Sequence, residues 1–390
     1  MVYYLKFLSI GKIKAVLKGK FKMEKNCLDF INNAVNNFQV TGVPRGCMPY
    51  GNGHINDSFR LVCDQPDGSE SAYIIQAVNN SIFKNPRQVM ENIEKVTAHL
   101  RKKATDPREV LQLVPTHNGN SYYIDKNKKC WRVYRFIENS LCIERPERTD
   151  DFYECGIAFG KFQRDLSDFP ADELYEVLPK FHDTAKRYRD FQKAVKEDSV
   201  GRAHGVLKEI AFINERADFY GLLADAHKNG ELPLRVSHND TKTNNAMLDA
   251  TTRKALCVID LDTIMPGFSV TDFGDAIRFG ASTAAEDEKD LSKVGMDLGM
   301  FTAFADGFLT GCDGQLEDSE IMLMPEGAKM MTIECAMRFL ADYLSGDTYF
   351  KIKYPEHNLD RCRTQLKLVA DMERNWEAMK QIVSKYCKNR

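Results

Sequence analysis

The residues whose types and spacing suit a chemical reaction lie in the loop His238-Asn-Asp-Thr-Lys-Thr-Asn-Asn245 and just beyond it. Asp240 precedes Asn245 by five positions, and Asp260 and Asp262 follow after one hairpin's length. Phosphoryl transfer needs such a set, because a carboxylate takes the proton of the attacking hydroxyl while an Asn and an Asp hold the magnesium that bridges the phosphates. We therefore predict Asp240 as the catalytic base. The predicted metal ligands are Asn245, Asp260 and Asp262.

Two short apolar runs must position these side chains. Ala246-Met-Leu248 and Leu256-Cys-Val-Ile259 flank the turn-like stretch 249–254, and this pattern predicts a β-hairpin. Residues two apart in a strand face the same side, so we expect Asp260 and Asp262 to point the same way. The alternative interpretation is a polar hairpin loop whose Asp and Asn side chains only cap turns.

The spacing from Asp to Asn is that of the protein-kinase catalytic loop. His238-Asn-Asp-Thr-Lys-Thr-Asn-Asn245 and Val258-Ile-Asp-Leu-Asp262 together resemble the aminoglycoside phosphotransferase and choline kinase superfamily. When Ile259-Asp-Leu-Asp-Thr-Ile-Met-Pro-Gly267 and Asp272-Phe-Gly-Asp275 are included, the sequence looks closer to bacterial N-acetylhexosamine 1-kinases. This resemblance covers about residues 24–385. It implies ATP- and Mg²⁺-dependent phosphorylation of the anomeric hydroxyl of N-acetylglucosamine or N-acetylgalactosamine.

The resemblance also implies an α+β, protein-kinase-like fold of two lobes, a sheet-rich N-lobe and a mainly helical C-lobe, with ATP and magnesium in the cleft. The predicted division is a basic N-terminal extension at 1–23, a nucleotide-binding N-lobe at 24–137 and a catalytic, sugar-binding C-lobe at 138–390. The expected partners are a small sugar and ATP.

The resemblance assigns three sugar-binding residues in the C-lobe. Arg338 and Tyr349 match the sugar-pocket stretch of the hexosamine kinases and are expected to hydrogen-bond the sugar. Trp376 is expected to stack on the sugar ring. The alternative for each is a helix-packing role.

Other polar residues around the hairpin receive supporting roles. Lys242 is close enough in sequence to Asp240 to reach the transferring phosphate, so we predict it as a second catalytic residue. His238 is expected to brace the loop and not to transfer protons. Asp272 and Asp275 are expected to cap a helix and brace the same loop.

A glycine-bearing turn, Tyr50-Gly-Asn-Gly-His-Ile-Asn-Asp-Ser-Phe59, stands near the start of the predicted N-lobe. Glycine lets the backbone approach nucleotide phosphates closely, so Gly51 and Gly53 are predicted to bind the nucleotide. A plain hairpin turn is the alternative. His54, in the same turn, is predicted among the substrate-binding residues.

The strand Ser71–Val78 should carry the Lys that contacts phosphates in protein kinases, but it contains none. Gln76 is predicted to take part in nucleotide binding, and Glu91, on the following helix, stands where the partner of the Lys would be. The hexosamine kinases usually place an Arg where this chain has Ala77. Lys84 and Arg87 are possible replacements, although solvated surface positions suit both better.

The remaining elements follow from hydrophobic periodicity. Further strands are expected at 110–114, 122–124 and 130–137, and helices at 24–42, 85–94, 152–166, 180–195, 207–226, 300–308, 328–343 and 366–386.

Bulk properties exclude several classes of protein. The 390 residues carry a net charge of −2, which gives no general attraction to nucleic acid or to an anionic membrane. The 11 cysteines include no Cys-x-x-Cys pair, which favours reduced thiols and a cytoplasmic location. No apolar run approaches the ~20 residues of a membrane span. The lysine-rich residues 1–22 are interpreted as a disordered or upstream-translated extension, with a membrane-surface helix as the alternative.

Three rival functions stay open at this point. The first is a kinase of the same fold acting on an aminoglycoside, choline, homoserine or methylthioribose, although the acidic acceptor loops expected for cationic substrates are not obvious. The second is a nucleotide-binding pseudokinase, which Ala77 favours and the intact Asp240, Asn245 and Asp260 disfavour. The third is a protein kinase, which the lack of an activation segment and of Ala-Pro-Glu disfavours.

Overall fold

The computed structural model describes residue 31 and residues 34–51 and 55–388. The chain forms two compact units, one ending at Glu138 and one made of Lys95–Val110 together with the chain from Asn139 onward. The first unit comprises the residues up to Glu94 and Leu111–Glu138. The predicted extension at 1–23 and the residues Gly53 and His54 lie outside the described residues. The predicted domain boundaries stay a prediction.

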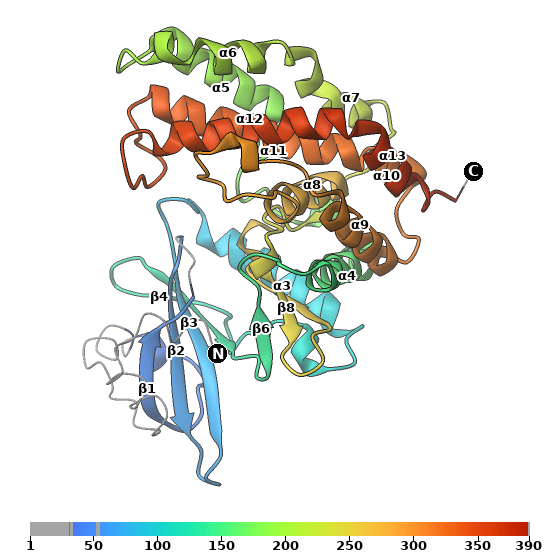
Figure 1. Ribbon diagram of the computed structural model, residues 1–390. Coiled ribbons are helices and arrows are strands. Elements are labelled where there is room, and N and C mark those ends of the chain that lie inside the picture. Colours follow the sequence, from blue (N-terminus) through green and yellow to red (C-terminus); the bar gives the residue numbers. More distant parts are fainter. Residues whose placement is uncertain (1–30, 32–33, 52–54, 389–390) are drawn as a thin grey trace, which may run out of the picture. The chain divides into compact units, whose positions relative to one another are not determined.

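The first unit is built on a five-stranded antiparallel sheet in the order β1-β2-β3-β5-β4. Figure 1 shows β1, β2 and β3 side by side. The strands are β1 (Val43–Pro49), β2 (Asp57–Asp64), β3 (Glu70–Val78), β4 (Tyr123–Ile124) and β5 (Cys130–Arg135). Between β1 and β2 lies the stretch of the glycine-bearing turn, of which residues 52–54 lie outside the described residues.

One face of this sheet carries the apolar core of the unit. Leu61, Tyr73, Ile75 and Trp131 alternate with residues of the other face and are buried against Phe38 and its neighbours. The predicted helix at 24–42 extends too far, because Phe38 already forms a β-bridge with Thr116. Its earlier part lies largely outside the described residues.

The predicted strand at 110–114 is wrong. Within it only Leu113 forms an isolated bridge, to Tyr134. Backbone hydrogen bonds from Val114 N to Val133 O (2.8 Å) and from Arg135 N to Gln112 O (2.9 Å) hold the segment beside β5. The pairing is therefore real but too short to make a strand.

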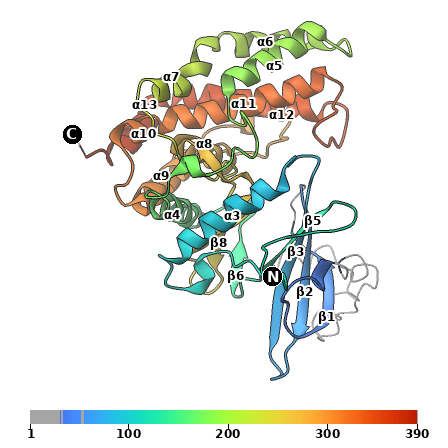
Figure 2. The ribbon, with the colours of Figure 1, turned by 180° about the vertical axis from the view of Figure 1, so that it is seen from behind.

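The second unit is mainly helical, so the predicted α+β class with a sheet-rich first part and a helical second part is confirmed (Figure 1). Helix α3 (Pro86–Arg101) begins in the first unit and ends in the second, because the division falls after Glu94. The helices of the second unit are α4 (Thr149–Asp165), α5 (Thr184–Glu197), α6 (Leu207–Asn214), α7 (Leu222–Lys228), α8 (Ser269–Gly280), α9 (Leu298–Cys312), α10 (Asp318–Met322), α11 (Met324–Leu344), α12 (His357–Arg374) and α13 (Trp376–Ser384). Figure 2 shows α11 and α12 running side by side.

Two predicted helices are each broken into two. The stretch 207–226 forms α6 and α7 with a 3₁₀ turn between them. The stretch 366–386 breaks at Asn375, whose side-chain Nδ2 donates to the Asp371 carbonyl oxygen at 2.9 Å. An Asn that satisfies a backbone carbonyl in this way offers the chain an alternative to continuing the helix.

Helices α8 and α11 cross at unusually close range through glycine. A Cβ added to Gly327 of α11 would lie 2.1 Å from the Val270 carbonyl oxygen, and one added to Gly274 would lie 2.3 Å from the Gly327 carbonyl oxygen. The two backbones therefore touch, and this contact fixes the side chains of α8 relative to those of α11.

Short strands in the second unit support the predicted reactive loop. Strands β8 (Ala246–Asp249) and β9 (Ala255–Val258) pair as the predicted hairpin, and β6 (Ser140–Cys142) adds a third strand. Strand β7 (Arg235–Ser237) pairs with β10 (Met265–Gly267).

The structure adds two general observations on the described residues. No helix among them combines the length and apolar composition needed to cross a membrane. The cysteines among them form no disulfide bond.

Candidate active site

His238 lies at the base of the reactive loop and is fully buried. Its Nε2 donates to the Ile259 carbonyl oxygen at 2.8 Å, and its Nδ1 accepts from the backbone N–H of Asp240 at 3.3 Å. Because one ring nitrogen faces an acceptor and the other a donor, the neutral imidazole with its proton on Nε2 satisfies both bonds. His238 braces the loop through these contacts, as the sequence suggested.

Further hydrogen bonds connect the reactive loop, residues 238–245, to residues 259–263 after the hairpin. The Ile259 N–H donates to the Asn245 carbonyl oxygen at 2.9 Å, and Thr263 Oγ1 donates to the His238 carbonyl oxygen at 2.7 Å. Asn239 Nδ2 donates to the Thr263 carbonyl oxygen at 3.0 Å. The structure thereby brings the loop of Asp240 and the segment of Asp260 together.

The carboxylate of Asp240 is held from two sides. Lys242 Nζ lies 2.7 Å from Asp240 Oδ1, and Asn245 Nδ2 donates to Oδ2 at 3.3 Å and to the Asp240 carbonyl oxygen at 2.8 Å. The Asp240 side chain keeps 23% of its exposure, so a substrate hydroxyl can reach it. A carboxylate that is fixed yet accessible suits a proton acceptor.

Lys242 keeps its positive charge in this position. Burial alone would lower the pKa of its ammonium group, but the carboxylates of Asp240 and Asp275 outweigh burial and raise that pKa. The side chain keeps 39% of its exposure. The cation is therefore available to an anionic group that approaches Asp240.

Asp260 and Asp262 differ from the prediction. Strand β9 ends at Val258, Asp260 has a left-handed backbone with φ of 60°, and Asp262 lies in the 3₁₀ turn Leu261–Thr263. The expectation that strand alternation points both to one side is wrong, since neither residue is in a strand. Asp260 is exposed and Asp262 is 4% exposed. A non-glycine residue in this conformation is strained, and such strain gathers at functional sites.

The donor set fits a magnesium ion that is also bound by phosphates. Asn245 uses its Nδ2 on Asp240, which leaves its Oδ1 as a hard oxygen donor. Magnesium is commonly held by one or two carboxylates plus substrate phosphates, and not by a dedicated cage. Among the described residues, no group of three or more His, Cys, Asp or Glu side chains is placed to hold a metal ion.

Asp272 braces the reactive loop from helix α8. Its carboxylate accepts from the backbone N–H groups of His238 (2.8 Å) and Asn239 (2.7 Å) and from Gln163 Nε2 (2.9 Å). Burial raises the pKa of Asp272 although the hydrogen bonds oppose the rise. The predicted bracing role is confirmed. The predicted helix cap is wrong, because α8 begins after Phe268 and Asp272 lies inside its first turn.

Asp275 is likewise inside α8 and caps nothing. It forms a buried ion pair with Arg278, whose Nη2 lies 2.9 Å from Asp275 Oδ1 and whose Nη1 also contacts Glu286 at 3.0 Å. Burial would raise the pKa of Asp275, but the charges of Arg278 and Lys242 hold it below the usual range. Asp275 therefore remains an anion, and its charge helps to keep Lys242 protonated.

Arg338, on α11, has its guanidinium among aromatic rings. Its Cζ lies 5.5 Å from the ring centroid of Phe350, 5.9 Å from that of Tyr349 and 6.0 Å from that of Phe181. Within the part of the chain that the structure describes, Arg338 makes no hydrogen bond or ion pair. The structure therefore brings Arg338 and Tyr349 together and leaves the donors of the guanidinium available.

The loop that carries Tyr349 is fixed by one buried carboxylate. Asp342 accepts from the backbone N–H groups of Thr348 (2.9 Å), Tyr349 (2.8 Å) and Phe350 (3.0 Å), and from Asn358 Nδ2 (2.9 Å). The rings beside Arg338 are therefore pre-positioned, although Tyr349 itself is 67% exposed.

Trp376 is not part of this group. Its ring centroid lies 5.6 Å from Lys329 Nζ and 5.5 Å from Lys380 Nζ. Lys329 precedes Arg338 by nine residues of α11, which is about 13 Å of helix. The predicted stacking of Trp376 on a sugar finds no support in these contacts and stays a prediction.

In the first unit, Gln76 lies on the sheet face opposite the apolar core. Its Oε1 accepts from Arg132 Nε at 2.9 Å, and its Nε2 donates to Ser58 Oγ at 2.9 Å. Arg132 stands directly across from Gln76 on β5 and is 1% exposed. Sequence reasoning missed this cation, although an Arg inside the apolar run Cys130–Tyr134 was a visible signal.

The remaining predicted residues of the first unit have weaker support. Glu91 is half-buried and makes no hydrogen bond or ion pair with another described residue. Lys84 and Arg87 are exposed, in line with the solvated role favoured from the sequence. Gly51 has a φ of +86°, which an L-residue rarely adopts.

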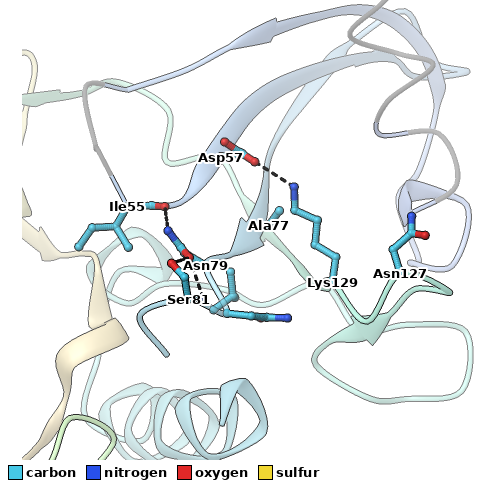
Figure 3. A pocket seen from close by; sticks show the side chains of 9 residues that line it. Ile55, Asp57, Ala77, Asn79, Ser81, Asn127 and Lys129 are labelled. Atoms are coloured by element: carbon cyan, nitrogen blue, oxygen red, sulfur yellow. Dashed lines mark hydrogen bonds and ion pairs between the residues drawn. The ribbon is translucent and has the colours of Figure 1, made fainter. Parts of the chain in front are cut away.

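Ala77 faces the opposite side from Gln76. It is 1% exposed and lines a pocket of about 410 Å³, together with Ile55, Asp57, Val78, Asn79, Asn80, Ser81, Asn127 and Lys129 (Figure 3). Asp57 and Lys129 form an ion pair of 2.9 Å beside it. A longer side chain at position 77, such as the Arg of the hexosamine kinases, would therefore point into this pocket and away from the face of Gln76. The Ala at this position does not change the charge on the face that Gln76 occupies.

Comparison with known proteins places these observations in context. The family model of the phosphotransferase enzyme family matches residues 47–294, more than half of the chain. The structure is similar to an aminoglycoside phosphotransferase from Alicyclobacillus acidocaldarius, with a TM-score of 0.59, 12% identity and coverage of 91% of this chain and 96% of that one.

Two further solved structures have the same fold. One is an amicoumacin kinase in complex with AMP-PNP, Ca²⁺ and Ami, with a TM-score of 0.56, 12% identity and coverage of 92% and 96%. The other is an ethanolamine kinase from Plasmodium vivax, with a TM-score of 0.52, 16% identity and coverage of 93% and 96%. The protein-kinase-like fold predicted from the sequence is thereby confirmed.

Proposed function

Because the chain belongs to the phosphotransferase enzyme family, we propose that it is an ATP- and Mg²⁺-dependent kinase that phosphorylates the anomeric hydroxyl of an N-acetylhexosamine. Similar folds include small-molecule kinases, one of them crystallised with a nucleotide analogue and a divalent metal. The intact group of Asp240, Asn245 and Asp260 supports catalysis over the pseudokinase alternative.

The protein's own residues carry the proposed reaction as follows. Asp240, fixed by Lys242 and Asn245, accepts the hydrogen bond of the sugar hydroxyl and takes its proton as the sugar oxygen bonds to the γ-phosphorus of ATP. The bond from that phosphorus to the β-phosphate oxygen breaks in the same step, and ADP leaves. Lys242 places a positive charge beside the carboxylate, where it can offset the charge of the transferring phosphoryl group.

Asn245, Asp260 and Asp262 are the proposed metal ligands. A magnesium ion held by them would offset the negative charge of the nucleotide phosphates. In the first unit, Gly51 and Gln76 are the proposed nucleotide-binding residues, with Glu91 less well supported.

The observation that carries the substrate proposal is the guanidinium of Arg338. It has no hydrogen-bond acceptor among the described residues and lies among the rings of Phe181, Tyr349 and Phe350. A sugar offers what this group needs, because its hydroxyl and acetamido oxygens accept hydrogen bonds while its apolar ring face packs on aromatic rings. A cationic acceptor such as choline, ethanolamine or an aminoglycoside would meet a like charge here.

ADP release with a panel of acceptors tests this proposal. N-acetylglucosamine, N-acetylgalactosamine, glucose, choline, ethanolamine and kanamycin are compared, and phosphorus NMR of the product distinguishes an anomeric phosphate from a 6-phosphate. We expect turnover with an N-acetylhexosamine and a 1-phosphate product. Turnover of another acceptor with both N-acetylhexosamines inert would refute the substrate and leave the kinase activity standing.

Substitution of Arg338 by Ala tests its role directly. A hydrogen bond to a charged group contributes about 1.5–3 kcal/mol, so Arg338→Ala should raise the KM for the sugar roughly 10- to 100-fold and leave the KM for ATP unchanged. Arg374→Ala serves as the matched control, since that guanidinium is 64% exposed and, among the described residues, forms its ion pair with Asp371. Equal KM values for the sugar in the two variants would exclude Arg338 from the substrate site.

A further inference from the structure

A buried histidine outside the predicted site contacts the reactive loop. His182, in the turn before α5, has Nδ1 3.0 Å from Glu334 Oε1 and Nε2 3.1 Å from the Asn239 carbonyl oxygen. The second oxygen of Glu334 accepts from Thr184 Oγ1 at 2.7 Å. The His182 side chain is 12% exposed and that of Glu334 is 1% exposed.

Both ring nitrogens of His182 therefore face oxygen acceptors. A neutral imidazole carries one N–H and can satisfy only one of them, whereas the imidazolium donates to both. The geometry assigns two protons to the ring and a negative charge to Glu334. This arrangement differs from that of His238, where one nitrogen faces a donor.

The charges around His182 support the same protonation state. Burial would lower the pKa of His182, but the hydrogen bond and charge of Glu334 outweigh burial, and the carboxylate of Asp275 adds to the rise above the usual 6.5. Asp272, on the same helix as Asp275, also interacts electrostatically with the ring. Arg338 acts on Glu334 and helps to keep it ionised.

The hydrogen bond to Asn239 is at a sensitive point of the loop. Asn239 has a left-handed backbone with φ of 63° and immediately precedes Asp240. The Asn239 carbonyl carbon is bonded to the amide nitrogen of Asp240, so the orientation of this peptide group determines the position of the Asp240 backbone. A non-glycine residue in this conformation persists only where its surroundings hold it, and the bond from His182 Nε2 is one of those restraints.

Resting on the function proposed above, we propose that His182 is a positioning residue: its imidazolium form, paired with Glu334, holds the Asn239 carbonyl and thereby the Asp240 carboxylate. Loss of its proton leaves one of the two acceptors without a donor and loosens the loop. The ring centroids of Phe181 and His182 lie 4.4 Å apart, and Arg338 Cζ lies 6.0 Å from the Phe181 centroid. The turn that carries His182 therefore also contributes a ring to the aromatic group around Arg338, the proposed sugar-binding residue.

The first test needs no substrate. Nitrogen NMR of the full-length protein labelled at histidine and aspartate reports both the protonation of the His182 ring and the Asp240 amide, with His182→Gln giving the assignment of the ring. We expect both ring nitrogens to be protonated at pH 7 and the amide nitrogen of Asp240, which is bonded to the Asn239 carbonyl carbon, to shift with pH in parallel with the ring. A neutral ring at pH 7, or an Asp240 amide that does not follow it, overturns the proposal.

The second test uses turnover. In wild type, kcat should fall as pH rises through the pKa of His182, and Glu334→Gln should move this fall to lower pH because the carboxylate that raises the pKa is gone. His182→Ala should lower kcat roughly 10- to 100-fold, as expected for misplacement of a reacting group, and His182→Gln should restore part of it without the alkaline fall.

The exposed His204 provides the matched control, and His204→Gln should keep the wild-type pH profile. A Glu334→Gln variant whose alkaline limb coincides with that of wild type contradicts the proposal, because a merely structural loss lowers activity equally at every pH. If no acceptor is phosphorylated, the proposed function fails, and the NMR test still decides whether His182 controls the loop.

Discussion

At the scale of single residues, Asp240 combines restraint with access. Its two carboxylate oxygens face Lys242 and Asn245, and its side chain still reaches solvent. The hydrogen bonds that fix it come from its own loop, whereas those that fix the loop include two to the Asp272 carboxylate, 32 residues later in the chain. The residues proposed to react are therefore close together in the sequence, whereas the residues that hold their loop lie elsewhere in the chain.

The first prediction concerns the base. Asp240→Asn keeps the shape of the side chain but removes the proton acceptor, so kcat should fall by at least ~10²-fold. Affinity for ATP, measured by calorimetry, should change little because the carboxylate faces the acceptor. Asp150→Asn, at a side chain 79% exposed, is the control. Wild-type turnover in Asp240→Asn would remove Asp240 from the mechanism.

The second prediction concerns the metal. Asp260→Ala removes an exposed carboxylate beside Asn245, so the affinity for ATP in the presence of magnesium should fall at least ~10-fold, while affinity in its absence stays nearly constant. Calorimetry with and without magnesium measures both. If affinity and turnover equal those of wild type, Asp262 takes the place of Asp260 as the ligand.

At this scale, the features of the site that could be predicted from the sequence are those formed by residues close together in the chain. The five-residue spacing from Asp240 to Asn245 and the hairpin after it were readable, and so was the bracing by His238. The partners of His182 and Arg132 were not, because they lie on other elements: Glu334 is 152 positions from His182, and Gln76 is 56 from Arg132. Only the placement of a charged residue in an apolar strand hinted at the second pair.

At the scale of elements, the crossing of α8 and α11 connects the two halves of the proposed site. Helix α8 carries Asp272, which braces the reactive loop, and α11 carries Glu334 and Arg338. Their separation is set by Gly274 and Gly327, where neither backbone leaves room for a Cβ. A glycine in a helix usually costs stability relative to Ala, so these two are explained by packing.

The third prediction follows from that crossing. Gly327→Ala places a Cβ 2.1 Å from the Val270 carbonyl oxygen, so the helices must move apart at a cost of about 1–3 kcal/mol, and kcat should fall with them. Gly205→Ala is the matched control, since nothing lies within 4 Å of its Cβ. Urea unfolding and kcat measured on both variants test this. Equal stability of the two would contradict the close crossing.

Elements were predicted well where periodicity was strong and poorly where a tertiary contact decided. Strands β3 and β5 and helices α4, α9 and α11 follow the apolar pattern of the sequence. The breaks between α6 and α7 and at Asn375 do not, because a side chain or a 3₁₀ turn interrupts an otherwise continuous pattern. The left-handed backbone of Asp260 overrode the strand alternation in the same way.

At the scale of the whole molecule, the second unit by itself holds the reactive loop, the proposed metal ligands and the group around Arg338. It also holds several buried charges whose pairing makes the folded state sensitive to pH. Among them, Glu334 and His182 have pKa values moved in opposite directions by one contact. Burial would raise the pKa of Glu334, but its hydrogen bond with His182 lowers it below the usual 4.5.

The last prediction is the pH dependence of stability. The raised pKa of His182 contributes stability that is complete below 6.5 and is lost as pH rises through the folded pKa. The lowered pKa of Glu334 contributes stability that is complete above 4.5 and is lost as pH falls through the folded pKa. The difference in Tm between wild type and Glu334→Gln should therefore be largest between pH 4.5 and 6.5 and should shrink on both sides.

Glu373→Gln is the control that separates the two limbs of this curve. The pKa of Glu373 is also lowered: burial would raise it, but the hydrogen bonds of Arg216 and Lys329 outweigh burial. The partners of Glu373 are an Arg and a Lys, residue types that are ordinarily cationic across neutral pH, so the difference in Tm for Glu373→Gln should shrink only on the acid side. An alkaline decline that is equal in the two variants would mean that His182 does not carry it, and the buried pair would then be neutral in the folded protein.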